Sequence, residues 1–367
     1  MSKAAELANL IGNINAGGGG VNRNLIINGA MNVSQRGTSF ADPSNDTYTL
    51  DRFIARKSND GAVTITQDSS APSGFSNSLK VDVTSADDSL GTSQFNILQY
   101  KVEAQDCQRL AFGTSDAKNF TLSFYVKSNK TGTYSVNISQ SDNSSKQASL
   151  TYTINSADTW ERKSLTFTGD TSGVINDDNG TGLSIYWWLA VGTLYTSGGS
   201  TSASFQTFAN ANHAAGHAVN LLDDAANEWF ITGVQLEVGQ NATSFEHEPV
   251  ERTLAKCLRY YHRLDTSSGE YIGFSAGGAY GSTTALTEFK PIVPMRIEPT
   301  FSTNAYGNSN FVIVTGSTTK QISSSIAVTG SNDGIRLNVT PTSSMTVGDY
   351  AYLQLNDTAY VEFIAEL

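Results

Sequence analysis

Apolar and polar residues alternate in short runs over the first two thirds of the chain. In 120–128 (FTLSFYVKS) Phe, Leu, Phe and Val occupy every second position, and polar side chains lie between most of them. This alternation is typical of a β-sheet with one face on a core. Similar runs occur at 24–28, 62–67, 78–84, 133–139, 148–155, 162–169, 182–191 and 228–239. About ten short strands with Gly, Asn and Asp turns predict a two-sheet, jelly-roll-like β-sandwich over residues 21–248.

The first residues have a helical period instead. Their apolar positions recur at three- and four-residue steps, at Leu7, Leu10, Ile11 and Ile14. A helix of about three turns is marginal alone in water, so it needs a partner or copies of itself. The glycine run that follows is typical of a flexible tether. Residues 1–20 therefore predict an anchoring helix on a tether, although a frayed chain end gives the same pattern.

A second helical pattern covers 249–264, PVERTLAKCLRYYHRL. Its apolar stripe consists of Leu254, Leu258, Tyr261 and Leu264, with the basic side chains mainly off it. Such a helix packs either on the sandwich or on its own copies, as the neck of a three-fold fibre. We predict a helical neck here.

Strand patterns return from residue 265 to residue 367. They occur at 271–276, 286–293, 310–316, 320–330, 334–340, 349–356 and 360–367. About 100 residues suffice for a small sandwich. The expected fold class is all-β: a jelly-roll-like sandwich and a smaller C-terminal β domain, joined by a short helix, with a short helix at the N-terminus.

Charge and composition exclude several classes of protein. The 367 residues include 23 basic and 34 acidic side chains, a net charge of −11, which disfavours nucleic acid as a partner. We find neither an apolar run of about 20 residues nor a secretory signal, so we expect no membrane insertion. Two cysteines, Cys107 and Cys257, do not make a disulfide scaffold. We expect both to be reduced and buried, in a chain made in a cytoplasm.

Three short motifs are candidates for chemistry, and each has a simpler interpretation. Gly273–Gly277 matches G-x-S-x-G, but the four histidines precede it and no helical pattern follows. His213 and His217 have a spacing that can hold zinc, yet we find no clear third ligand and Gly216 weakens a helix. Residues 176–180 have the composition of a calcium loop without its spaced acids. We expect no catalytic residue and no assigned metal site.

Aromatic side chains are the remaining candidates, because sugar rings stack on them. Alternation within 185–189 places Trp187 on one face and Tyr186 and Trp188 on the other, where they could form a binding face or a subunit contact. Trp160 and Trp229 are more typical of core positions. In the C-terminal unit, Tyr271, Tyr280 and Tyr306 occur in Gly- and Asn-rich turns, where they could contact a ligand.

Several long stretches of the sequence also resemble those of known proteins. They are NRNLIINGAMNVSQRGTSF at 22–40, DRF at 51–53, and residues 72–87, 108–128, 158–173 and 219–263. Together these stretches resemble tail-fibre-like proteins of marine tailed bacteriophages, collinearly over roughly residues 5–263. Residues 120–239 are also similar to the jelly-roll sandwiches of carbohydrate-binding modules. Through that second likeness a structural calcium ion is conceivable, with Glu237 a weak candidate, but the sequence does not place one.

The resemblance implies a virion structural protein, a homotrimeric tail fibre that adheres to a host surface glycan or protein. It would attach to the phage tail or to other virion proteins through the N-terminal helix, with residues 265–367 as the distal tip. The mechanism would be adhesion rather than catalysis. A decoration or cement protein on the phage capsid is the alternative, because a sandwich with an anchoring arm suits that role too.

Overall fold

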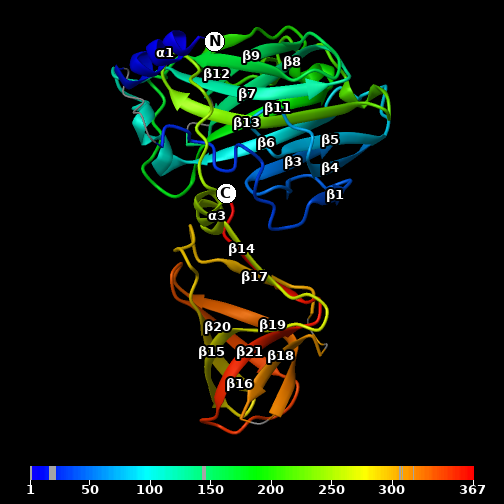
Figure 1. Ribbon diagram of the computed structural model, residues 1–367, viewed down its shortest axis with the longest axis vertical. Helices are drawn as coiled ribbons and strands as arrows, with labels where there is room; N and C mark the ends of the chain where they lie inside the picture. The colour runs from blue at the N-terminus through cyan, green and yellow to red at the C-terminus, as the bar shows by residue number, and fades with distance from the viewer. Residues whose placement is uncertain (1, 16–21, 143–145, 306, 308, 317) are drawn as a thin grey trace. The chain divides into compact units, whose positions relative to one another are not determined.

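The computed structural model describes residues 2–15, 22–142, 146–305, 307, 309–316 and 318–367. The chain divides into two compact units, Met1–Thr253 with Leu367, and Leu254–Glu366. Strands dominate both units, as the sequence predicts (Figure 1). Among the described helices, none combines the length and the apolar character needed to span a membrane. Cys107 and Cys257 are free thiols and both are buried.

In the first unit the described strands form two antiparallel sheets packed face to face (Figure 1). The first sheet has the order β1 (Ser39–Ala41), β4 (Ala62–Asp68), β5 (Ser78–Ser85), β13 (Glu228–Val238), β7 (Phe120–Ser128), β10 (Glu161–Phe167). The second has the order β12 (Ser202–Thr207), β9 (Lys146–Ile154), β8 (Gly132–Gln140), β11 (Thr181–Val191), β6 (Phe95–Glu103), β3 (Phe53–Ser58), β2 (Thr47–Tyr48). The chain crosses repeatedly between the sheets, which confirms the predicted jelly-roll-like sandwich.

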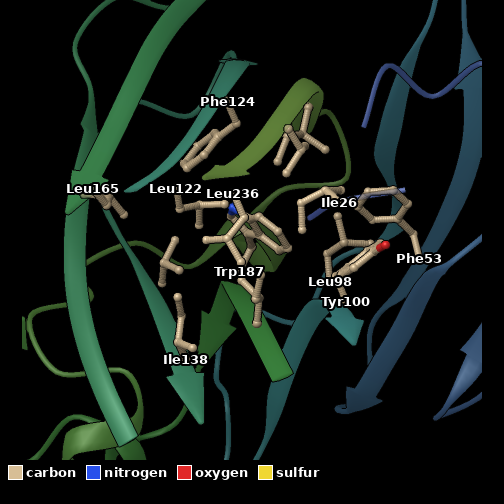
Figure 2. Close-up of a cluster of buried hydrophobic side chains, with 14 of the residues drawn as sticks. Ile26, Phe53, Leu98, Tyr100, Leu122, Phe124, Ile138, Leu165, Trp187 and Leu236 are labelled. Atoms are coloured by element: carbon tan, nitrogen blue, oxygen red, sulfur yellow. The ribbon is translucent and has the colours of Figure 1, made fainter. Parts of the chain in front are cut away.

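The core of the sandwich lies between these sheets. Figure 2 shows side chains from both sheets meeting there, among them Phe124 of β7, Leu236 of β13 and Trp187 of β11. All three are fully buried. A side chain of this size contributes about 1.5–3 kcal/mol when it leaves water. Because side chains alternate along a strand, the residues of β7 between these core positions, such as Tyr125, point to the outer face of the sheet.

Residues 24–28, predicted as a strand, are not one in the structure. The segment runs along β13 but bonds to it partly through a side chain. The Asn24 amide oxygen accepts hydrogen bonds from the backbone N–H groups of Ile26 (2.9 Å) and Leu236 (3.0 Å), and its NH₂ group donates to the Val234 carbonyl (3.1 Å). Because the side chain takes these backbone partners, no regular ladder forms.

The helical pattern predicted over 249–264 is wrong in its second half. Helix α3 (Val250–Leu258) ends at Leu258, and the chain continues as strand β14 (Tyr261–Asp265). β14 pairs with β22 (Tyr360–Ile364), Tyr261 opposite Ile364 and Leu264 opposite Val361. The pairing partner comes from about 100 residues later in the chain, so long-range pairing overrides the local helical period.

The C-terminal unit is a barrel rather than the expected small sandwich. Over its described residues a closed barrel is formed by β15 (Tyr271–Gly281), β16 (Thr284–Phe289), β20 (Ile335–Pro341), β19 (Thr318–Gly330), β18 (Phe311–Thr315) and β21 (Tyr350–Asn356). A smaller sheet has the order β14, β22, β17 (Thr300–Thr303). Barrel closure leaves no unpaired edge among these strands, which a short sandwich does not achieve.

Candidate functional site

An aromatic cluster lies on the outer face of the first sheet. The ring of Phe75 lies 5.4 Å from that of Tyr125 on β7, between centroids. It also lies 5.0 Å from Phe245 and 5.0 Å from His247, both in the segment that follows β13. These are ordinary distances for interacting rings. Phe75, Tyr125 and Phe245 remain half-buried and His247 is exposed, so the cluster faces solvent.

A bulged glycine in β13 makes room for this cluster. The β13–β7 register shifts between Thr232 and Gln235, and Gly233 in the bulge has φ +60°. A Cβ atom at Gly233 would lie 2.7 Å from Phe75 Cζ and 2.9 Å from Tyr125 Cδ2. Glycine is the residue that combines this backbone with such close ring contact.

Glu237, the weak calcium candidate, holds the segment that carries Phe245. Its side chain is fully buried. One carboxylate oxygen accepts from Gln235 Nε2 and from the Thr243 backbone N–H, both at 2.8 Å. The other accepts from the Thr243 hydroxyl at 2.7 Å, and Arg23 Nε lies 3.6 Å from it. Glu237 therefore fixes the loop after β13 through protein donors.

The aromatic cluster borders a cleft of about 810 Å³, called here the aromatic cleft. Its lining comprises Glu6, Ser73, Phe75, Tyr125, Arg162, Ser164, Gln240, Asn241, Ala242, Ser244, Phe245 and His247. Arg162 lies on β10 directly opposite Tyr125. Rings beside hydroxyls, amides and one guanidinium suit a polar ligand with flat apolar faces, such as a sugar.

The outer face of the second sheet is covered. Residues 192–220, called here the covering segment, include η2 (Thr193–Tyr195) and α2 (Asn210–His213), and between them β12, which is itself the edge strand of this sheet. Trp188 is 1% exposed, with its ring 5.1 Å from Tyr195 and 5.0 Å from His213. Tyr186 is half-buried beside the same histidine. The prediction of a binding face is therefore wrong for Trp188, because later chain packs over it.

The two histidines with zinc spacing have separate surroundings. His213 lies among the rings of Tyr186, Trp188, Tyr195 and Phe208, and burial, with a smaller effect of Arg56, lowers its pKa to about 4. His217 Nε2 lies 2.6 Å from the Val219 carbonyl oxygen and its Nδ1 lies 3.2 Å from the Ser135 nitrogen.

Burial also lowers the pKa of His217 to about 4, against a smaller opposing effect of its bond to Val219. In the 176–180 segment the Asp178 carboxylate caps its own turn, accepting from the Gly180 N–H at 2.8 Å. Among the described residues, no three His, Cys, Asp or Glu side chains gather as a metal site would require.

The tyrosines predicted to contact a ligand in the C-terminal unit do not form one site. Tyr271 is 70% exposed and Tyr280 is 76% exposed, at opposite ends of β15. Nine residue steps along the strand place them at most roughly 30 Å apart. Tyr306 lies outside the described residues.

A shallower hollow of about 590 Å³ lies beside β15, lined by Gly273, Phe274, Ser275, Ala276, Glu288, Lys290, Tyr350 and Tyr352. The G-x-S-x-G residues Gly273–Gly277 lie within β15, and Ser275 is 5% exposed. A further strand, β16, follows them, so the motif lacks the strand–turn–helix context of a nucleophile elbow.

The two predicted helix stripes differ in exposure. On α1 (Lys3–Asn15), Leu7 and Ile11 are exposed and Leu10 is half-buried, while the side chain of Ile14 lies outside those described. The neck residues do not share a helical face, because Tyr261 and Leu264 lie on β14. Of that set, Leu258 and Tyr261 are buried and Leu254 is at the edge of exposure.

Comparison with known proteins supports no family assignment. No protein-family model matches the sequence, and no curated relative matches it. The tail-fibre resemblance therefore stays an expectation.

Solved structures match 57–60% of the chain at low similarity. The enzymatically active domain of tailspike protein 4 from bacteriophage CBA120 aligns with 59% of this chain, at 12% identity and TM-score 0.31. This chain spans 21% of that domain's length. The family 11 carbohydrate-binding module of Clostridium thermocellum, in complex with a β-1,3-1,4-mixed-linked tetrasaccharide, aligns with 57% of this chain and 98% of its own, at 12% identity and TM-score 0.28.

TmCBM61 in complex with β-1,4-galactotriose aligns with 60% of this chain and 99% of its own, at 10% identity and TM-score 0.26. These values are too low to transfer a ligand or an activity to this chain.

Sequence reasoning missed the residues of the aromatic cleft. Alternation within 120–128 does place Tyr125 on the face opposite the core, but it does not mark that residue as part of a site. Phe75 and Phe245 lie outside any strand, so no period marks them. Arg162 had no signal of its own, since an arginine at an outward strand position is ordinary. What joins these residues is the strand order, which the sequence did not provide.

Proposed function

We propose that this protein is a glycan-binding adhesin of a bacteriophage particle, acting as a tail fibre without turnover of its ligand. The aromatic cleft is the observation that carries the proposal. It offers half-buried rings beside amide, hydroxyl and guanidinium groups, the combination that recognises both the apolar face and the hydroxyls of a sugar ring.

The exposed apolar side chains of α1 support a role in attachment. Leu7 is 57% exposed and Ile11 is 49% exposed on a helix of 13 residues. A helix of this length gains most of its stability from burying an apolar face. The particle would provide that partner, and a homotrimer would raise weak single-site affinity through avidity.

A panel of bacterial surface polysaccharides, printed on a slide and probed with the intact chain, tests glycan binding. We expect at least one polysaccharide to bind, and Phe245→Ala to weaken that binding about tenfold by removing a stacking ring. Val174→Ala is the matched control, because Val174 is an exposed apolar residue that does not line the aromatic cleft. Absence of binding to every polysaccharide by the unmodified chain would contradict the proposal.

Immunogold electron microscopy of intact particles tests the location. We expect label at the tail. Label spread over the head would favour the capsid-decoration alternative, and absence of label on any particle would contradict both. Light scattering on the purified chain tests the oligomeric state, for which we expect three copies.

A further inference from the structure

Arg162 is positioned in the aromatic cleft by neutral partners. Its Nη2 donates to the Thr243 carbonyl and lies 3.5 Å from the Ser123 hydroxyl. Its guanidinium carbon lies 6.0 Å from the centroid of the Tyr125 ring. Among the described residues, no carboxylate lies within 4.0 Å of this guanidinium. A half-buried positive charge is thus held in place without an ionic partner.

Several other basic side chains of the sandwich do have such partners. Arg56 Nε lies 2.8 Å from Asp46, Lys80 lies 2.6 Å from Glu228, and Arg23 lies 3.6 Å from Glu237. In a chain with 34 acids and 23 bases, carboxylates are plentiful. An arginine without one, in the lining of a cleft, is available for a carboxylate from outside.

The charge of the site selects among anions. A guanidinium offers a planar fork of donors that matches two oxygens of a carboxylate or of a phosphate. Its single charge also balances that of a carboxylate, whereas a phosphate monoester carries about −1.5 to −2. Of the described lining residues, Arg162 is the cleft's one lysine or arginine. The aromatic rings beside it favour an anion attached to a sugar ring over a small free ion.

We propose that the aromatic cleft binds its glycan through an acidic sugar residue, whose carboxylate pairs with the Arg162 guanidinium while its ring lies against Phe75, Tyr125 and Phe245. This inference rests on the proposed glycan binding and names the class of sugar. Glu6 of α1 also lines the cleft, with its carboxylate 2.9 Å from the Ser244 hydroxyl. Its negative charge opposes a bound carboxylate.

Carboxyl reduction of the ligand gives a direct test. The polysaccharide panel is printed twice, once native and once after carbodiimide activation and borohydride reduction, which convert carboxylates to alcohols. At about 0.15 M salt, we expect the unmodified chain to bind a native acidic polysaccharide at least about tenfold more tightly than its reduced form. Arg162→Gln should lose that preference, and Arg162→Lys should retain part of it because the charge stays while the fork is lost.

Two further variants complete the test, one as a control outside the cleft and one as an independent change within it. Arg109→Gln removes the same charge from an exposed arginine that donates to a backbone carbonyl (Asn22, 2.7 Å) outside the cleft, and we expect it to bind like the unmodified chain. Glu6→Gln leaves the sheet untouched and should tighten binding of the acidic form about two- to threefold. It keeps the inference testable if Arg162→Gln does not fold.

The failures are distinguishable. Equal binding to native and reduced forms, or an unchanged preference in Arg162→Gln, would overturn the acidic-sugar inference and leave glycan binding intact. Binding that survives carboxyl reduction but is lost after cleavage of phosphodiesters with hydrofluoric acid would assign the anion to phosphate and also overturn it. If the unmodified chain binds nothing, the proposed function is wrong and the inference with it.

Discussion

The outer faces of the two sandwich sheets both carry aromatic side chains, but these are covered by later chain on one sheet and border an open cleft on the other. On the second sheet, the covering segment packs Tyr195 and His213 against Trp188. On the first sheet, Phe75 and Phe245 lie beside Tyr125 and border a cleft that stays open. One face therefore buries its rings under later chain, and the other leaves them half-buried beside a cleft, where we propose that they contact a ligand.

The polar groups on the two faces differ in the same way. Under the covering segment, Ser149 donates to the Asn212 carbonyl at 2.6 Å and Gln147 donates to the Ala209 carbonyl at 2.8 Å, so sheet side chains bond to the chain above them. In the aromatic cleft, the exposed residues Ser73, Ser164 and Gln240 line the wall. Side chains bonded to the chain that covers them are typical of a structural face, and exposed polar groups around an open hollow are typical of a binding face.

Removal of Trp188 has the largest expected effect on stability. Trp188→Ala should lower the free energy of unfolding of the sandwich by about 3–5 kcal/mol, because it leaves a large cavity under the covering segment. Urea unfolding followed by fluorescence of Trp160, Trp187 and Trp229 measures this, since these tryptophans lie in the first unit. Trp160→Ala is the matched control and should cost less, because Trp160 is half-exposed. A Trp188→Ala chain of normal stability that loses polysaccharide binding would make the second sheet the binding face.

The second-largest expected effect is a loss of stability of the sandwich at acidic pH. The pKa of His213 and that of His217 are about 4 in the folded chain, against 6.5 for an ordinary histidine. Between these values the unfolded chain binds more protons, so stability falls as pH drops from 6.5 toward 4, by up to about 3 kcal/mol per histidine. Urea unfolding at pH 7 and pH 5 measures the loss, and His213→Phe should reduce it. An unchanged loss in His213→Phe would show that His213 is not its source.

Gly233 tests the open face. Gly233→Ala should cost about 1–2 kcal/mol for the left-handed backbone and should also displace the rings of Phe75 and Tyr125, so polysaccharide binding weakens. Gly198→Ala is the matched control, since Gly198 has φ +76° and a Cβ atom there would meet nothing within 4 Å. It should cost similar stability and leave binding unchanged. Equal binding by both variants would argue against the aromatic cleft.

The comparison of the two faces also explains what the sequence predicted well. Alternation located most sandwich strands within one or two residues, because a sheet with one buried face imposes a period of two. The same period correctly placed Trp187 and Trp188 on opposite faces of their strand, although it did not say which face is core. It could not predict that residues 192–220 return to cover Trp188, since that depends on contacts between distant parts of the chain.

The candidate site was beyond the sequence for a related reason. Phe75, Arg162 and Phe245 come from segments about 80 residues apart, and they meet because β10, β7 and β13 are neighbours in the first sheet. Strand order is a long-range property that local patterns do not encode. The helix predicted through Leu264 failed similarly, because β22 lies about 100 residues away in the sequence.

The smallest effects are expected at the exposed tyrosines of the C-terminal unit. Tyr271→Ala and Tyr280→Ala should each change the free energy of unfolding by less than about 0.5 kcal/mol, because most of each side chain is already in water. If the aromatic cleft carries recognition, polysaccharide binding by each variant should stay within about twofold of the unmodified chain, since one sugar ring cannot span the nine residue steps of β15 between the two tyrosines. The same printed panel measures this beside Phe245→Ala. Loss of binding in Tyr280→Ala with normal binding in Phe245→Ala would move the receptor contact from the sandwich to the barrel, one of the two units in which the sequence offers candidate tyrosines.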